Sequence, residues 1–100
     1  MCGIAFVRGE RDADKIVCEM LDRLAYRGPD GEGRYVDEGA DAVLGHKRLA
    51  IIDPKGGAQP ILTPDGDAAL IANGMIYNYE GLREDLLAHE PALVFRTGSD

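Results

Sequence analysis

The sequence predicts an α+β domain that combines a mostly antiparallel sheet with two helices. Short apolar runs bounded by Gly, Pro and Asp recur along the chain, as expected for strands separated by turns. Two longer segments place apolar residues three and four positions apart, which is typical of amphipathic helices. A turn-rich segment at 63–67 joins two of the apolar runs, so antiparallel pairing is the simplest arrangement.

The first third of the chain predicts a strand, a helix and a second strand. Residues 3–8 form a compact apolar run, which would fix the amino terminus in the sheet. Asp12 or Asp14 can cap the helix that follows. Pro and Gly make 27–33 a turn segment, and a strand is expected at 34–37. The apolar stripe of the helix consists of Ile16, Val17, Met20, Leu21 and Leu24.

The remaining chain predicts further strands and a second helix. Residues 42–52 read as one long strand, and 61–62 and 68–73 as a hairpin. Asn78 is a plausible cap for a helix that ends near residues 89–91, and 93–95 is a candidate strand. Side chains expected on one face of the long strand are Leu44, His46, Arg48, Ala50 and Ile52, and those expected to point inward from the second helix are Leu82, Leu86 and Leu87.

Composition limits the classes of function. A chain of 100 residues with 45% hydrophobic residues suits one domain, and its net charge of −7 argues against a nucleic-acid surface. No apolar run is long enough for a membrane span and no secretory signal is present, so we expect a cytoplasmic protein. In that compartment Cys2 and Cys18 should both be thiols, and the Cys and His spacing predicts no metal site.

Cys2 is the first candidate for chemistry, because removal of Met1 would give one residue both a thiol and a free α-amine. An α-amine can act as a base at neutral pH, and cysteine is a strong nucleophile. Such an amino-terminal nucleophile needs no separate His or Asp. From Cys2 alone, an inert buried cysteine is the alternative.

Asn73 and Gly74 follow an apolar run and could form an oxyanion hole, in which an amide and a main-chain N–H meet a developing negative oxygen. An Asn-Gly pair by itself is more often a tight turn. Arg48 and Asp100 could bind the carboxylate and the ammonium of an α-amino acid. The alternatives are an internal salt bridge for Arg48 and a solvated carboxylate for Asp100.

Several motifs together resemble a known domain. The chain is similar to the glutaminase domain of class II glutamine amidotransferases, in particular to the glutamine-hydrolysing asparagine synthetase family. The resemblance spans residues 1–100. It rests on Met1-Cys2-Gly3-Ile4, Arg27-Gly28-Pro29-Asp30-Gly31, Leu44-Gly45-His46-Lys47-Arg48-Leu49-Ala50-Ile51, Gln59-Pro60, Asn73-Gly74-Met75-Ile76-Tyr77-Asn78 and Thr97-Gly98-Ser99-Asp100.

The resemblance implies a fold and a reaction. The fold would be an Ntn-hydrolase-like αββα sandwich, of which this chain is the amino-terminal part, with the later strands of the type 2 amidotransferase domain missing. The reaction would be hydrolysis of glutamine through a γ-glutamyl thioester. The ammonia would pass to a carboxy-terminal synthetase domain or subunit, which uses ATP and Mg²⁺ to amidate aspartate. That domain is absent here, so no cofactor is expected in this chain, and a homodimer is left open.

The resemblance also implies site residues. Cys2 would be the nucleophile with Asn73 and Gly74 as the oxyanion hole, Arg48 would bind the α-carboxylate and Asp100 the α-ammonium, and the turn at 27–31 would shape the site. Leu49, Ile51 and Met75 would also line the substrate site. The family usually has Glu at the position of Met75 and His at the position of Tyr26.

The sequence is also compatible with two other functions. One is a non-catalytic remnant or subunit that binds a partner protein through an unpaired sheet edge. The other is an amino-terminal nucleophile hydrolase that acts on a different amide. Among amidotransferases, relatives directed to aminosugars or purines fit the motifs less well than asparagine synthetase.

Overall fold

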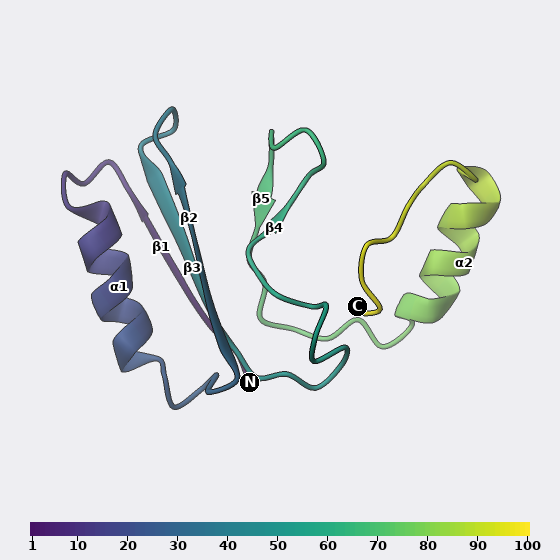
Figure 1. Cartoon of the computed structure of the whole chain (residues 1–100), viewed down its shortest axis with the longest axis horizontal. Coiled ribbons are helices and arrows are strands. Elements are labelled where there is room, and N and C mark those ends of the chain that lie inside the picture. Colours follow the sequence, from purple (N-terminus) through teal and green to yellow (C-terminus); the bar gives the residue numbers. More distant parts are fainter.

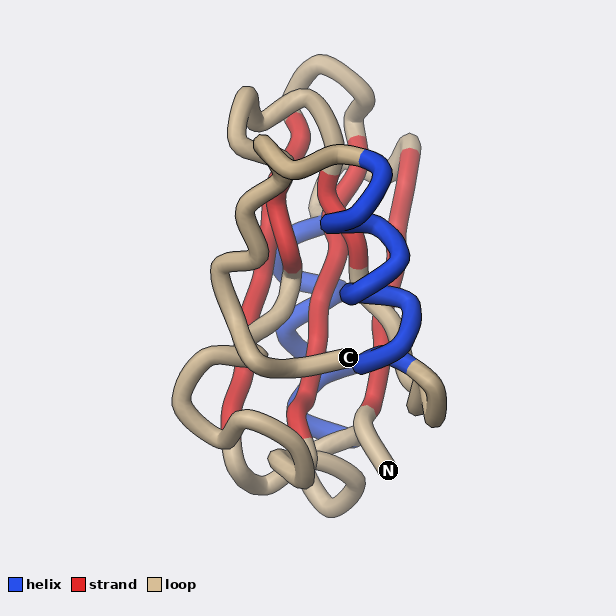
Figure 2. Tube along the Cα trace, turned by 90° about the vertical axis from the view of Figure 1, so that its right-hand side faces the viewer, coloured by secondary structure: helices blue, strands red, loops and turns tan.

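The computed structural model describes residues 1–100. Figure 1 shows a sheet with one helix against it, then a small hairpin, then a second helix at the far end of the molecule. In the view turned by 90°, strands and helices run in a common direction and loops gather at both ends (Figure 2). The elements are β1 (Gly3–Arg8), α1 (Ala13–Arg23), β2 (Gly31–Asp37), β3 (Ala42–Arg48), β4 (Ile61–Leu62), β5 (Ala69–Leu70) and α2 (Tyr79–His89).

The main sheet has the order β1-β3-β2, and both pairings are antiparallel. Gly3 pairs with Lys47, and Gly31 pairs with Arg48. The start of β1, the start of β2 and the end of β3 therefore meet at one end of the sheet. β4 and β5 form a separate antiparallel hairpin. These features confirm the predicted α+β class with a mostly antiparallel sheet and two helices.

The core lies between α1 and the sheet. Val17 and Leu21 are fully buried there, as the predicted stripe required, whereas Ile16 on the same stripe is exposed. Gly45 of β3 lets the helix approach closely, since a Cβ at that position would lie 2.6 Å from a methyl group of Val17. The buried hydrophobic cluster comprises Ala5, Ala13, Val17, Leu21 and Val43.

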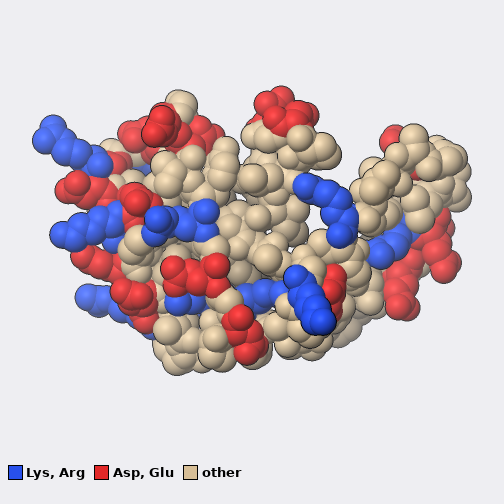
Figure 3. Space-filling view, in the orientation of Figure 1, with Lys and Arg blue, Asp and Glu red and all other residues tan.

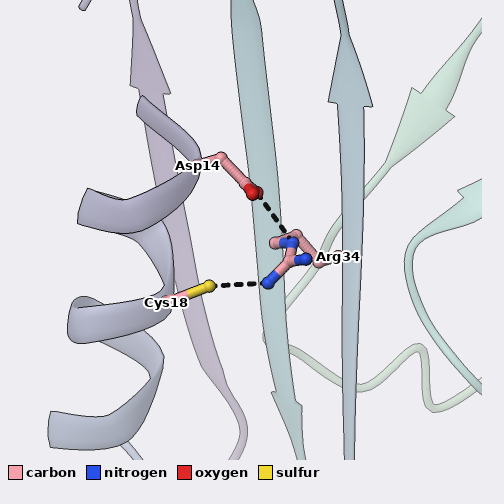
Figure 4. Close-up of polar contacts among 3 residues, drawn as sticks. All are labelled: Asp14, Cys18 and Arg34. Carbon is pink, nitrogen blue, oxygen red and sulfur yellow. Dashed lines mark hydrogen bonds and ion pairs between the residues drawn. The ribbon is translucent and has the colours of Figure 1, made fainter. Parts of the chain in front are cut away.

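A polar cluster ties α1 to β2. Arg34 of β2 forms an ion pair with Asp14, with 2.8 Å between Nε and Oδ1, and its Nη1 donates to the Cys18 sulfur at 2.6 Å (Figure 4). Cys2 and Cys18 are both free thiols. The predicted cap residue Asp12 directly precedes α1, but its side chain makes no capping hydrogen bond.

Two strand boundaries differ from the prediction. The strand expected at 42–52 ends at Arg48, because the following loop folds back so that its carbonyl groups bind the Arg48 guanidinium. The face predicted to continue through Ala50 and Ile52 is therefore interrupted. The strand expected at 34–37 begins earlier, at Gly31, because pairing with the end of β3 extends it.

The carboxy-terminal third departs further from the prediction. The second hairpin strand, expected at 68–73, is limited to β5, and the strand expected at 93–95 is a loop. In that loop the guanidinium carbon of Arg83 lies 4.7 Å from the centroid of the Phe95 ring.

Asn78 precedes α2 as predicted but does not cap it with its side chain. The prediction that the leucines of α2 point into a core is wrong, because no residue of α2 is buried.

On the face shown in Figure 3, basic and acidic side chains alternate over α1 and the main sheet, and no single basic patch forms there. None of the helices combines the length and the apolar character needed to cross a membrane. No group of three or more His, Cys, Asp or Glu side chains is arranged to hold a metal ion.

Candidate active site

One cavity brings together all eight residues that the sequence singled out. It has a volume of about 320 Å³ and lies where the end of β3 faces the segment after β5 and the chain terminus. Its lining includes Cys2, Arg48, Leu49, Ile51, Asn73, Gly74, Met75 and Asp100. Residues almost a hundred positions apart thus share one space that is large enough for an amino acid.

Cys2 enters the cavity because β1 begins directly after it and pairs with β3. This pairing brings Cys2 next to the end of β3, where the main-chain N–H of Leu49 donates to its sulfur at 3.3 Å. The Cys2 side chain is therefore directed by the main chain of a distant segment. Met1 precedes Cys2 and lines the same cavity, so the nitrogen of Cys2 is a peptide nitrogen while Met1 is present.

The turn at 27–31 holds the nucleophile and the end of β3 in place. Arg27 donates from Nε to the carbonyl of Cys2 at 3.1 Å. Asp30 accepts a hydrogen bond from the N–H of Ala50 at 2.8 Å. Gly28 packs on the main chain of β3 so closely that a Cβ would lie 2.4 Å from the Lys47 carbonyl oxygen. Only glycine allows this approach.

Arg48 is the last residue of β3 and makes no ion pair, so the alternative of an internal salt bridge is not realised. Its guanidinium donates instead to three loop carbonyls, those of Ile52 at 2.9 Å, Asp53 at 2.7 Å and Pro54 at 2.9 Å. A guanidinium has five N–H groups, so two remain for a ligand. Gly57 lies against the group, since a Cβ there would be 2.3 Å from Nη2.

Asn73 and Gly74 follow Ala72, whose N–H and carbonyl both form hydrogen bonds to side chains. The N–H of Ala72 donates to Oε1 of Gln59 at 2.7 Å, and its carbonyl is 3.1 Å from Nε2 of His46. His46 is 1% exposed, and burial lowers the pKa of its imidazole below the ordinary 6.5, so the ring is neutral at pH 7. Its Nε2 then donates to Ala72. No protein atom lies near the position that a Cβ of Gly74 would take.

Asp100 reaches the cavity from the end of the chain. Its Oδ2 accepts the N–H of Ile76 at 2.7 Å, and its Oδ1 accepts the hydroxyl of Ser99 at 3.3 Å. The bond from Ile76 connects Asp100 to the segment that carries Asn73 and Gly74. Met75 contributes an apolar, half-exposed wall beside this carboxylate.

Comparison with known proteins identifies the family. A family model described as "Glutamine amidotransferase domain" matches residues 1–100. The chain belongs to the glutamine amidotransferase domain family. The match covers the whole chain, so every element and every cavity residue described above lies within this domain.

Relatives of this amidotransferase domain carry the name asparagine synthetase (glutamine-hydrolysing). One from Arabidopsis thaliana, numbered 3, is 44% identical over 104 residues, and one from Sandersonia aurantiaca is 45% identical. A probable asparagine synthetase from Dictyostelium discoideum is 44% identical. Each alignment covers 100% of this chain but only 17%, 19% and 18% of the respective relative. The chain thus spans less than a fifth of the length of these relatives.

Residues that the sequence did not single out also line the cavity or hydrogen-bond to the residues that line it. Gln59 belonged to a recognised motif, but its contact with Ala72 depends on the loop that precedes β4. For Asp53, the sequence predicts only the end of a strand. Its left-handed φ of 45° and its bonds to distant main chain emerge from the fold. The only feature of the sequence that could have indicated these contacts of Asp53 is that Pro54 and the glycines Gly56 and Gly57 follow it. Further lining residues are Met1, Ile52, Gly57, Ala72, Tyr77 and Ser99.

Proposed function

We propose that this chain carries the glutaminase half-reaction of a glutamine-dependent amidotransferase. The observation that supports this most strongly is the single cavity shared by Cys2, Arg48, Asn73, Gly74 and Asp100 in a chain of the amidotransferase family. A thiol, two amide-type donors and one charge of each sign match a substrate with a zwitterionic end and a side-chain amide. Glutamine has both features.

The mechanism begins once Met1 has been removed. The α-amine of Cys2 accepts the thiol proton, and the sulfur attacks the side-chain carbonyl carbon of glutamine. Asn73 and Gly74 donate to the oxyanion of the tetrahedral intermediate. The intermediate collapses with cleavage of the C–N bond, and the α-ammonium returns its proton to the departing ammonia. Water then hydrolyses the γ-glutamyl thioester to glutamate and regenerates the thiol.

Arg48 and Asp100 bind the substrate ends that do not react. The positive charge of Arg48 binds the α-carboxylate, and the Asp100 carboxylate binds the α-ammonium. Because these contacts are the same in the ground state and in the transition state, they should govern KM more than kcat. Leu49 and Ile51 line the same cavity and add apolar surface to it.

The ammonia is destined for amidation of aspartate in a synthetase domain or subunit that uses ATP and Mg²⁺. The names of the relatives support this acceptor. In this scheme the present chain needs no metal or cofactor of its own, because thioester formation and hydrolysis use only the residues named above.

Labelling of Cys2 tests the proposal directly. A diazo-ketone analogue of glutamine should add once to the chain, on residue 2, in a protein whose intact mass lacks Met1. Cys2→Ala should abolish the adduct, and the matched control Cys18→Ala should retain it. Labelling that persists in Cys2→Ala would refute the assignment of the nucleophile. Faster ammonia release from asparagine than from glutamine would favour a different amide substrate.

A second candidate is a non-catalytic subunit that binds a partner protein. Two observations favour it: Asp100 is the only acidic residue that lines the cavity, and α2 exposes large apolar side chains such as Leu82 and Leu86. Retention of Met1 in the purified protein would support this alternative. Glutaminase activity that depends on Cys2 would exclude it.

A further inference from the structure

The loop after β3 turns at Asp53, whose main chain is bound to the guanidinium of Arg48. Asp53 has a φ of 45°, a left-handed conformation that Asp and Asn tolerate better than most residues. Its carbonyl oxygen accepts from Nη2 of Arg48 at 2.7 Å and from the N–H of Gly57 at 3.1 Å. The main chain of Asp53 therefore helps to fix the direction of the Arg48 guanidinium.

The side chain of Asp53 binds a segment 45 residues away. Its Oδ1 accepts the N–H of Gly56 at 2.9 Å, and its Oδ2 accepts the N–H of Gly98 at 2.7 Å. The bonds from Gly98 and Gly56 lower the pKa of the Asp53 carboxyl below its ordinary 3.8, so the group is ionised at neutral pH. Gly98 lies two residues before Asp100. One residue thus contacts both the Arg48 side and the Asp100 side of the cavity.

We propose that Asp53 is a positioning residue that sets the separation between the carboxylate-binding Arg48 and the ammonium-binding Asp100. This inference rests on the proposed glutaminase function and extends it to a residue outside the cavity lining. A zwitterion must meet both charges at once, so its affinity depends on their separation. A reagent that lacks both charges depends only on the thiol.

The test compares two reagents on the full chain in a Cys18→Ala background, so that Cys2 is the only thiol. One reagent is the diazo-ketone analogue of glutamine, which carries both charges. The other is iodoacetamide, which carries neither. In Asp53→Asn the amide can accept only one of the two N–H groups. We expect the analogue concentration for half-maximal labelling to rise about tenfold, with the limiting rate and the iodoacetamide rate unchanged within about twofold.

Two further variants complete the design. Asp53→Gly removes the carboxylate but allows a positive φ, so it should reproduce the effect of Asp53→Asn if the side chain is responsible. Asp65→Asn is the matched control, because Asp65 is also a turn carboxylate with two hydrogen-bond donors, Thr63 and Asp67, but it lies outside the cavity. It should leave the half-maximal concentration unchanged.

The outcomes separate the two proposals. Unsaturable labelling of the parent chain, or labelling that glutamine does not suppress, would overturn the glutaminase function and this inference with it. If the parent behaves as expected, an unchanged half-maximal concentration in Asp53→Asn would overturn the role of Asp53 alone. An equal rise in Asp65→Asn, or an equal loss with both reagents, would also overturn it, because either result would reflect general damage to the fold.

Discussion

Asn73 owes its position to hydrogen bonds made by its neighbour. Ala72 is bound through its N–H by Gln59 and through its carbonyl by His46. A peptide fixed at both groups limits the backbone rotation that would move the next residue. This preorganisation matters for an oxyanion hole, because donors that are already in place need no rearrangement as charge develops.

We therefore expect Asn73→Ala to lower kcat for glutamine hydrolysis by about 10²- to 10³-fold with little change in KM, as is typical when one oxyanion donor is lost. Ammonia release measured over a range of glutamine concentrations separates the two constants. Asn78→Ala is the control, because Asn78 makes no side-chain capping bond and lies outside the cavity. A loss below about threefold in Asn73→Ala would contradict the oxyanion role.

Met75 provides a second prediction at a single residue. A carboxylate at this half-exposed position would add a second negative charge near the substrate ammonium. Met75→Glu should therefore lower KM for glutamine by about two- to fivefold, the range of a partly solvated ion pair. Met75→Gln has a similar shape without the charge and should leave KM unchanged. An ion pair would be contradicted if both substitutions changed KM equally. It would also be contradicted if the lower KM of Met75→Glu persisted at high salt.

The partners of Arg48 illustrate what sequence reasoning can reach at the level of one residue. Because apolar residues follow Arg48 in the sequence, its charge is expected to meet the oxygens of a carboxylate. The structure supplies them as carbonyls of the loop around Asp53 rather than as a carboxylate. Side-chain chemistry identifies the need for a partner. Only the path of the loop determines which oxygens meet it.

The two helices differ in how much they bury. α1 places Val17 and Leu21 in the core, whereas the leucines of α2 remain exposed. α2 is held mainly through Arg83, which donates to the carbonyls of Thr97 and Ser99 and lies over Phe95. A helix with few buried apolar contacts opens more easily than one in a core.

This contrast predicts different costs for equivalent truncations. Leu21→Ala should lower the free energy of unfolding by about 2–5 kcal/mol, because it leaves a cavity in the core. Leu86→Ala, at a side chain that is 49% exposed, should cost less than about 1 kcal/mol. Urea denaturation measures both. Similar costs would mean that α2 is packed more tightly than its exposure indicates.

Hydrogen exchange provides an independent check on the elements. Main-chain amides of α1 and β3 should be protected from exchange far longer than those of α2.

The difference in burial between the two helices also explains why the packing of α1 could be predicted and that of α2 could not. The spacing of apolar residues fixes which side of a helix is apolar, but not whether a second layer covers that side.

His46 connects the sheet to the cavity and makes the stability of the whole molecule depend on pH. Burial lowers the pKa of its imidazole below 6.5; the bond to Ala72 opposes this effect and the charge of Arg48 adds to it. Below pH 6.5 the unfolded chain therefore binds a proton that the folded chain does not. As the pH is lowered below 6.5, the free energy of unfolding should decrease by at most about 1.4 kcal/mol per pH unit. The decrease should stop once the pH is below the pKa of His46 in the folded chain.

Urea denaturation at pH 7.5, 6.5 and 5.5 measures this slope. His46→Gln keeps an N–H that can reach Ala72 but does not titrate, so it should remove the slope. His89→Gln is the control, because His89 is exposed at the end of α2, and it should retain the slope. A slope unchanged in His46→Gln would show that other groups control stability in this range.

The fold class follows from apolar periodicity and turn residues in the sequence. The family and the eight residues that share the cavity follow from the resemblance of its motifs, in their order, to those of glutamine amidotransferases. The tertiary structure decided where β3 ends, which oxygens bind Arg48, and that Asp53 contacts Gly98 across 45 residues. Such contacts depend on the path of loops in three dimensions, and the spacing of residues along a chain does not specify that path.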